Sequence, residues 1–408
     1  MSASSPTPPV AEEPVQTLRT IPLLVASLAG MGLASHLAAD SLRMAALLVL
    51  GSLLGVTLYH SSFGFTAAYR RLILHGEVRG IRAQLVMLAA ATLLFAPVLA
   101  AGEIFGQPVS GAVAPVGVSM FFGAFLFGIG MQLGGGCGSG TLYAVGGGSP
   151  RMLLVLTAFC GGGFWASLHM GAWQSLPEWE PQALGERFGW AVTALVQAGG
   201  LAGAAWALRR YDHAPQPAEF RLLRGPWPLM AGALLLALFN LVTVLLAGHP
   251  WNITWAFTLW GAKALQAVGW DPAGAPFWNA PFQRAALENS VLSDVTSVMN
   301  IGLILGAAGA AALAGRFSSV WRIPARSLAA AVLGGLAMGY GARLSYGCNI
   351  GAFFSGVAST SLHGWVWIIA ALIGSWLGVR WRPVFGLVNE PASRPTETIE
   401  SGAALRLR

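Results

Sequence analysis

Residues 134–140 read Gly-Gly-Gly-Cys-Gly-Ser-Gly, which places the thiol of Cys137 inside a glycine run that disfavours a continuous helix. A similar stretch returns at 344–351 as Leu-Ser-Tyr-Gly-Cys-Asn-Ile-Gly, with its thiol at Cys348. The two cysteines are 211 positions apart, and sliding the chain by that offset aligns eight further identities without a gap. The aligned pairs are Gly123 with Gly334, Gly128 with Gly339, Gly130 with Gly341, Leu133 with Leu344, Gly136 with Gly347, Gly140 with Gly351, Gly163 with Gly374 and Trp165 with Trp376. Single matches between glycine-rich apolar segments are common, but eight in phase with a cysteine indicate an internal repeat.

The composition is that of a membrane protein. Of the 408 residues, 55% are hydrophobic and only 10% are charged, and the mean hydropathy is +0.64. Soluble domains carry about 25% charged residues, so we predict a polytopic membrane protein. The net charge of +7 comes almost wholly from arginine, because Lys263 is the only lysine. Such a surplus is typical of cytoplasmic loops and does not indicate nucleic-acid binding.

The sequence argues against several kinds of site. Its three cysteines are odd in number and lie in apolar stretches, which disfavours a disulfide framework, and we interpret Cys160 as an inert packing residue. The chain has no nucleotide-binding loop, no paired carboxylates and no zinc-ligand spacing, so we expect no metal, no cofactor and no ATP-driven transport. Its first 18 residues are polar and proline-rich, without the pattern of a signal peptide.

Long and short apolar segments alternate along the chain. Ten are long enough to span a bilayer, which takes roughly 20 residues. They lie at about 21–38, 42–60, 82–101, 115–136, 150–170, 188–208, 228–247, 290–314, 326–344 and 363–380. The four shorter ones lie at 62–73, 138–147, 251–268 and 349–360. Short apolar pieces beside long ones are typical of re-entrant helices, which must be buried in protein or line a wet cavity. We therefore predict an all-α polytopic membrane protein with about ten spanning helices and four short re-entrant helices.

Arginine sets the expected orientation. Four loops hold the arginine clusters, which are Arg70, Arg71, Arg79 and Arg82; Arg209, Arg210, Arg221 and Arg224; Arg316, Arg322 and Arg326; and Arg380 and Arg382. With ten spans and a cytoplasmic N-terminus, all four clusters fall in the cytoplasm, as positive loops usually do. The acidic or neutral loops 101–114, 171–187 and 269–289 then all fall outside. Both termini are accordingly expected in the cytoplasm.

The repeat is expected to be inverted. In this topology the span before Cys137 runs from outside to inside, and the span before Cys348 runs the opposite way. Spans two to five then correspond to spans seven to ten. The predicted boundaries are a disordered N-terminal tail at 1–20, a first repeat at 21–208, a cytoplasmic linker at 209–226, a second repeat at 227–385 and a C-terminal tail at 386–408.

The helix breaks form the candidate site. A half-helix that starts after each cysteine begins with unpaired N–H groups and the positive end of its dipole, and both attract an anion. Inversion directs one such pair toward each face, so we expect the two thiols along one path, with a vestibule on either side of a narrow waist. The predicted pore residues at the breaks are Cys137, Cys348, Gly136, Gly138, Gly140, Gly347, Asn349 and Gly351.

Three further residues are candidates for the pore, but the sequence around them is less specific than that around the cysteines. Lys263 lies in a short apolar segment, where it could attract anions or pair with Asp294. His60 and Ser62 end a span and are weaker pore candidates, because a histidine there is often a plain helix-end residue. Arg343 lies one turn before the second cysteine and has the length to reach outward to water.

Around both cysteines the chain resembles the YeeE/YedE family of bacterial inner-membrane sulfur transporters. Two other stretches are similar to its longer YedE branch, Pro250-Trp-Asn-Ile-Thr-Trp-Ala-Phe-Thr-Leu-Trp-Gly-Ala-Lys263 and Asp294-Val-Thr-Ser-Val-Met-Asn300. The resemblance covers about 45–385. It implies thiosulfate uptake through an hourglass-shaped fold in the inner membrane, with thiols passing the ion along by S–H hydrogen bonds. The thiols at the two breaks match the family, whereas its further pore cysteine falls at Gly64.

Two classes of function stay open. In the preferred one the protein is not an enzyme but a passive or secondary transporter of a small sulfur-containing anion, most readily thiosulfate, with a selenium species as an alternative. In the other, Cys137 or Cys348 of a membrane enzyme carries sulfane sulfur as a persulfide, which requires a covalent intermediate. A purely structural subunit would leave the paired thiols unexplained. The expected partners are the anion and the lipid bilayer, and a cytoplasmic sulfur-carrier protein is a candidate partner.

Overall fold

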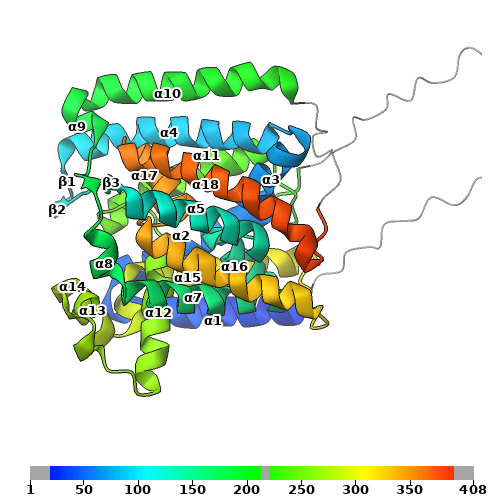
Figure 1. Ribbon diagram of the computed structural model, residues 1–408. Coiled ribbons are helices and arrows are strands. Elements are labelled where there is room, and N and C mark those ends of the chain that lie inside the picture. The colour runs from blue at the N-terminus through cyan, green and yellow to red at the C-terminus, as the bar shows by residue number, and fades with distance from the viewer. Residues whose placement is uncertain (1–18, 213–219, 390–408) are drawn as a thin grey trace, which may run out of the picture.

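The computed structural model describes residues 19–212 and 220–389, which form a bundle of long helices with short elements at its two ends (Figure 1). Nine segments in these ranges are long and apolar enough to cross a membrane. They contain α1 (Thr20–Asp40), α2 (Leu42–Ser61), α4 (Arg79–Ala101), α5 (Val118–Gly134), α10 (Trp190–Ala207), α11 (Leu229–Ala247), α15 (Val295–Leu313), α16 (Ala325–Leu344) and α18 (Leu362–Trp381). The predicted all-α polytopic class is confirmed. The expected tails at 1–20 and 386–408 lie mostly outside the described residues.

The expected span at 150–170 forms α7 (Pro150–Ser167) and is the one expected span that is not among these nine. Its first turn holds Pro150 and Arg151, and its second half holds three consecutive glycines at 161–163, all of which lower its mean hydropathy. The glycines serve packing, because a Cβ on Gly162 would lie 2.3 Å from the carbonyl oxygen of Leu336 in α16. The helix packs along α16 inside the bundle.

Short helices form at the four places where re-entrant segments are predicted. They are α3 (Phe65–His75), α6 (Gly138–Gly146), α12 (Thr254–Ala267) and a π-helical turn η4 (Asn349–Phe354) that continues directly into α17 (Ser355–Ala358). The longest, α12, has 14 residues. At 1.5 Å per residue that is about 21 Å, against the roughly 30 Å of a bilayer core, so none of them can span it.

The remaining elements are short and lie at the ends of the bundle (Figure 1). Two antiparallel pairs of two-residue strands join β1 (Glu103–Ile104) to β2 (Gln107–Pro108) and β3 (Val116–Gly117) to β4 (Glu178–Trp179). The short helices are α8 (Met170–Gln174), α9 (Leu184–Phe188), η1 (Leu208–Tyr211), η2 (Pro272–Gly274), α13 (Pro276–Asn279), α14 (Pro281–Glu288), η3 (Val291–Ser293) and η5 (Arg382–Phe385).

The central helices pack in pairs that the 211-residue offset exchanges: α5 packs against α18, and α16, its counterpart, packs against α7. The packing of α2 against α15 and of α4 against α11 follows the order of the spans in the two halves, not this offset. The glycines of α5 and α16 follow the offset. A Cβ on Gly123 would lie 2.7 Å from the carbonyl oxygen of Gly341, and one on Gly334 would lie 2.8 Å from that of Gly130. Because Gly334 and Gly341 are the offset partners of Gly123 and Gly130, the two contacts are equivalent.

The arginine clusters gather at one end of the bundle. Arg82 of the first cluster binds Asp212, which lies beside the second. Arg382 of the fourth donates to the carbonyl oxygen of Gln132 at 2.7 Å, and the side chain of Gln132 accepts from Arg70 of the first at 3.3 Å. The third cluster lies in the loop between α15 and α16, on the same side (Figure 1). We call this side the arginine end.

The opposite side of the bundle carries the loops that are poor in arginine. All four strands and the helices α8, α9, α13 and α14 lie there (Figure 1). Contacts join these loops to one another: Ser110 N donates to Gly248 O at 2.9 Å, and Leu184 N donates to Thr360 O at 2.9 Å. We call this side the loop end.

The exchanged glycine contacts predict a sharp difference between two glycines. A Cβ on Gly341 would lie 2.4 Å from the carbonyl oxygen of Gly123, whereas one on Gly309 would meet nothing within 4 Å. Gly341→Leu should therefore destabilise the protein by about 1–3 kcal/mol or more through overpacking, and Gly309→Leu should not. Thermal unfolding of the purified variants tests this; equal melting temperatures for the two would refute the close contact.

The two ends also predict a topology. Reporter fusions after Asp212 and at both termini should report the cytoplasm, because positive loops are retained there. A reporter inserted in the loop at 171–187 should report the outside. An outside signal at Asp212, with both termini inside, would break the inverted arrangement.

Candidate functional site

Both cysteines stand where a membrane helix stops and a short helix starts. α5 ends at Gly134, and Gly135 then turns the chain with a φ of +87°. α16 ends at Leu344, and Tyr346 and Gly347 turn the chain with φ values of +60° and +153°. The short helices α6 and η4 begin directly after each cysteine. The glycine runs thus fold locally as two helix breaks.

The two breaks meet inside the bundle. A Cβ added to Gly138, the first residue of α6, would lie 3.1 Å from the Sγ atom of Cys348. The thiol of the second half therefore lies against the half-helix that follows Cys137 in the first half. Both cysteines are almost fully buried, with exposed fractions of 1% and 0%. We call this meeting point, formed by residues 136–140 and 347–351, the waist.

The glycines predicted at the breaks lie where the chain is crowded. A Cβ on Gly136 or Gly347 would come within 3.2 or 2.7 Å of the backbone of the following half-helix. One on Gly351 would lie 3.0 Å from the side-chain oxygen of Asn252, and one on Gly140 would lie 3.6 Å from the nearer thiol. These positions keep the waist narrow because no side chains separate its backbone segments.

The waist has the electrostatics of two helix starts. The Sγ of Cys137 lies 3.4 Å from the Oγ of Ser139, and the Sγ of Cys348 accepts from the N–H of Ile350 at 3.5 Å. The carbonyl oxygens of the two cysteines accept the first hydrogen bonds of the two half-helices, at 2.8 and 2.9 Å. First-turn N–H groups and the positive dipole end of each half-helix therefore lie next to a thiol, and both favour a negative charge.

Two polar side chains near the thiols keep unused hydrogen-bonding capacity. Asn349 donates to the hydroxyl of Tyr69 at 3.2 Å, but its Oδ1 atom is buried and has no protein partner. The Oγ1 atom of Thr141, one turn into α6, is likewise buried without a partner. Buried polar atoms are normally paired, so these atoms are free to bind a polar ligand. Sequence reasoning missed Tyr69 and Thr141, because a lone hydroxyl in an apolar segment carries no positional signal.

A third interruption, between α11 and α12, packs against the waist. Its backbone is held at Trp251, whose N–H donates to Asn240 Oδ1 at 2.8 Å and whose carbonyl accepts from Ser355 at 2.8 Å. The carbonyl of Ile253 accepts from Asn300 at 2.9 Å. The side chain of Ile253 would lie 3.4 Å from a Cβ on Gly138, which places this interruption beside both cysteine half-helices.

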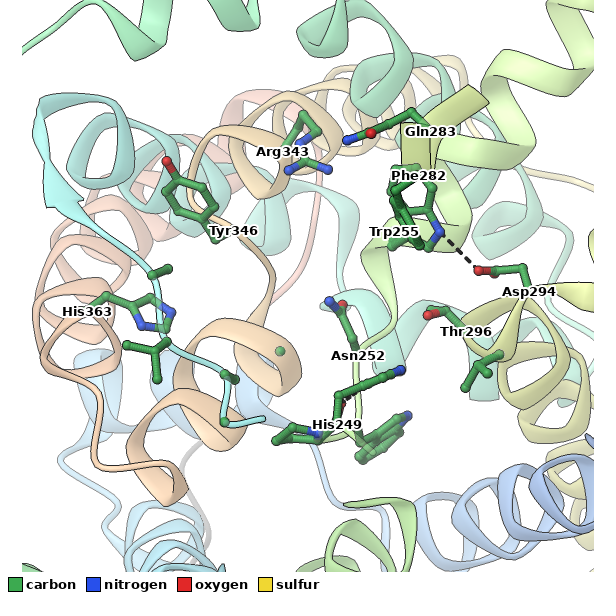
Figure 2. A pocket seen from close by; sticks show the side chains of 18 of the residues that line it. His249, Asn252, Trp255, Phe282, Gln283, Asp294, Thr296, Arg343, Tyr346 and His363 are labelled. Carbon is green, nitrogen blue, oxygen red and sulfur yellow. Dashed lines mark hydrogen bonds between the residues drawn. The ribbon is translucent and has the colours of Figure 1, made fainter. Parts of the chain in front are cut away.

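A cavity lies at each end of the bundle, and the one at the loop end reaches the waist at Gly351. The loop-end cavity, of about 550 Å³, is lined by Asn252, Arg343, Tyr346 and Gly351 among others (Figure 2). The arginine-end cavity, of about 240 Å³, is lined by Ser62 and Gly64 among others. A Cβ on Gly64 would lie 3.7 Å from the hydroxyl of Tyr143 in α6, an ordinary contact, so this position has room for a side chain.

Two predicted site residues lie elsewhere. The ring of His60 packs on Trp227 with centroids 5.3 Å apart, and its carbonyl accepts from the N–H of Trp227, so His60 holds the end of the linker. Lys263 donates to the carbonyl oxygens of Leu287 and Asn289 at 2.8 and 2.7 Å, which ties down the end of α14. Neither residue lines a cavity described above.

Asp294, the alternative partner predicted for Lys263, forms no ion pair with it in the part of the chain that the structure describes. Asp294 accepts from the indole N–H of Trp255 at 3.0 Å and caps α15 by accepting from Ser297 N at 2.7 Å. Within the described residues, no group of three or more histidine, cysteine or acidic side chains is placed to hold a metal ion.

Comparison with known proteins places these features in a family. A family model described as sulphur transport matches residues 60–377, which include both cysteines of the waist. The probable transporter YedE of Escherichia coli (strain K12) is 37% identical over 142 residues, or 34% of each chain. Its namesake from Salmonella typhimurium is 35% identical over the same share. The chain therefore aligns with about a third of the length of these two proteins.

Two other relatives align over most of their length. The thiosulfate transporter TsuA of Spirochaeta thermophila is 28% identical over 351 residues, which are 81% of this chain and 96% of that protein. TsuA of Escherichia coli (strain K12) is 24% identical over 358 residues, which are 81% of this chain and 92% of that one.

Proposed function

The chain belongs to the sulphur transport family, and from that membership we propose that it imports thiosulfate, or a closely related sulfur anion, across a bacterial inner membrane. The name of the two TsuA relatives, thiosulfate transporter, supports the choice of anion. The observation that carries the proposal is the waist itself. Two buried thiols, one from each half of the chain, lie at the waist; the loop-end cavity reaches it at Gly351, and the arginine-end cavity approaches α6 at Gly64.

The cavities match the energetic needs of such a path. The N-terminus of one half-helix offers an anion up to about 2 kcal/mol, so four of them offer roughly 8 kcal/mol at most. Removing all water from a doubly charged anion costs tens of kcal/mol. The anion therefore has to remain hydrated until it reaches the waist. The loop-end and arginine-end cavities supply that hydrated approach, and the dry stretch is confined to the thiols.

At the waist the protein replaces part of the lost water. The two S–H groups are weak donors, and they lie beside the first-turn N–H groups of α6 and η4. The hydroxyl of Thr141 adds a donor that no protein group uses. In this mechanism the anion is handed from one thiol to the other without forming a covalent bond, so the thiols must stay protonated. A thiolate would repel the anion.

The orientation follows from the two ends. We propose that 21–208 and 227–385 are the inverted repeats, joined by the linker at 209–226, and that the arginine end faces the cytoplasm. The exchanged contacts of α5 and α16 with α18 and α7 support the first statement, and the retention of positive loops in the cytoplasm supports the second. A cytoplasmic sulfur-carrier protein would then receive the anion at the arginine end.

The decisive test is uptake of radiolabelled thiosulfate into cells that lack their own importers. Cys137→Ala and Cys348→Ala should each reduce the initial rate to that of cells without the protein, because each removes a donor from a single path. The double variant should be no worse than either single one. Cys→Ser should also impair uptake, since a hydroxyl is shorter than a thiol.

Cys160→Ala is the matched control. Cys160 lies within the continuous helix α7, and the repeat has Ala371 at the equivalent position, so its uptake should equal that of the parent. Normal uptake by either Cys137→Ala or Cys348→Ala at normal abundance would exclude a gate of paired thiols. Absence of uptake in the parent, together with an added sulfur atom on either thiol, would favour the persulfide enzyme instead.

A further inference from the structure

Arg343 is a guanidinium without an anionic partner inside the loop-end cavity. It lies in the last turn of α16, and its Nε atom is buried with no hydrogen-bond partner. Among the described residues it forms no ion pair, and its Cζ atom lies 5.1 Å from the centroid of the Phe277 ring. Figure 2 shows the side chain pointing into the cavity. Arg343 is half-buried, and a guanidinium on the wall of a cavity that lacks a carboxylate partner among the described residues favours an anionic ligand.

The carboxylate that shares the cavity forms no ion pair with Arg343 in the part of the chain that the structure describes. Asp294 also lines the cavity, and its two oxygens accept from the indole N–H of Trp255 and from the backbone N–H of Ser297. Figure 2 shows Asp294 turned toward Trp255. The guanidinium of Arg343 therefore keeps N–H donors for a molecule that enters the cavity.

The other polar groups of the cavity are mostly neutral. Asn252 accepts from the N–H groups of Ile253 and Thr254 with its Oδ1 atom, which leaves its amide N–H groups available as donors. Figure 2 shows Asn252 across the cavity from Arg343. The same Oδ1 atom would lie 3.0 Å from a Cβ on Gly351, three residues after Cys348. A ligand held by Arg343 and Asn252 is thus placed directly before the waist.

The repeat has a neutral side chain at the position equivalent to Arg343. The offset that aligns the cysteines aligns Arg343 with Gln132 in the first half. Gln132 is fully buried, accepts from Arg70 at 3.3 Å and donates to the carbonyl of Thr66 at 3.2 Å, so it acts as a packing residue. The second half has replaced a satisfied amide with a charged side chain that lacks an ion-pair partner.

We propose that the loop-end cavity is a capture site for doubly charged tetrahedral oxyanions, in which Arg343 and Asn252 bind oxygen atoms before the anion reaches the thiols. The planar guanidinium suits two oxygens of one anion. This inference rests on the proposed function and extends it. Because Arg343 and Asn252 bind oxygen atoms of the anion and not the terminal sulfur of thiosulfate, the site captures sulfate as well as thiosulfate. Sulfate is therefore a competitive inhibitor of thiosulfate uptake.

The kinetic test compares three variants in the uptake assay. Arg343→Gln should raise the KM for thiosulfate by about ten-fold or more, as expected when charge-assisted hydrogen bonds are lost, with little change in the maximal rate. The inhibition constant of sulfate should rise by the same factor. For Arg343→Lys, both the KM for thiosulfate and the inhibition constant of sulfate should lie between those of the parent and those of Arg343→Gln. Arg284→Gln should match the parent, because Arg284 is exposed on α14 at the same end but does not line the cavity.

A binding test separates this inference from the transport function. Purified full-length protein should bind radiolabelled sulfate saturably in equilibrium dialysis. Arg343→Gln should lose that binding, whereas Arg284→Gln and Cys348→Ala should keep it. Binding that depends on Arg343 in a protein that imports no thiosulfate would refute the proposed function and leave the capture site standing.

The opposite results overturn the capture site. Normal uptake with an unchanged KM in Arg343→Gln would refute it while the transport function stands, and so would a loss of maximal rate alone. If Arg343→Gln fails to accumulate, Arg343→Lys decides, since it keeps the charge and the length of the side chain. Sulfate binding as tight as that of the parent in Arg343→Lys, or no inhibition of parent uptake by sulfate, contradicts recognition by the guanidinium.

Discussion

The meeting of two interrupted helices is the constraint on which the rest of the structure depends. Within a membrane, backbone N–H and C=O groups at a break must be covered by protein or reached by water. Here each break is covered by the other half of the chain, as the contact between Gly138 and Cys348 shows. Tyr69 of α3 accepts from Asn349 of the waist, the interruption before α12 packs against Gly138, and the loop-end cavity reaches the waist at Gly351. Because both helix breaks are buried inside the bundle, the thiols of Cys137 and Cys348 are buried as well.

This meeting is possible because the central helices approach each other backbone to backbone. Glycines replace side chains where α5 crosses α16 and α18 and where α16 crosses α7; on Gly128, for example, a Cβ would lie 2.2 Å from the carbonyl oxygen of Ala371. Overpacking at such a crossing would separate the halves and open the waist. The two halves are not identical in charge, since Arg343 stands where the first half has Gln132. That difference gives the loop end its unpaired cation.

The repeat, the helical class and the four short helices could be predicted from the sequence, because glycine spacing and segment length are local properties. The predicted inversion led us to expect the two breaks along one path, and the breaks lie together at the waist. The surroundings of the waist could not be predicted: Asn349 and Tyr69 are 280 residues apart, and only tertiary packing joins them. Charged and polar side chains were the least predictable, since Lys263 and His60 bind nearby loops whose paths the sequence does not specify.

The central claim is that both thiols line one anion path, and the alkylation rate of each cysteine in membrane vesicles tests it most directly. Mass spectrometry can follow all three cysteines in one sample, with and without thiosulfate. We predict that thiosulfate slows alkylation of Cys137 and Cys348 together and leaves Cys160 unchanged, so that Cys160 also reports any loss of reagent to thiosulfate itself. Equal slowing at all three cysteines, or slowing at only one thiol of the waist, would contradict the account.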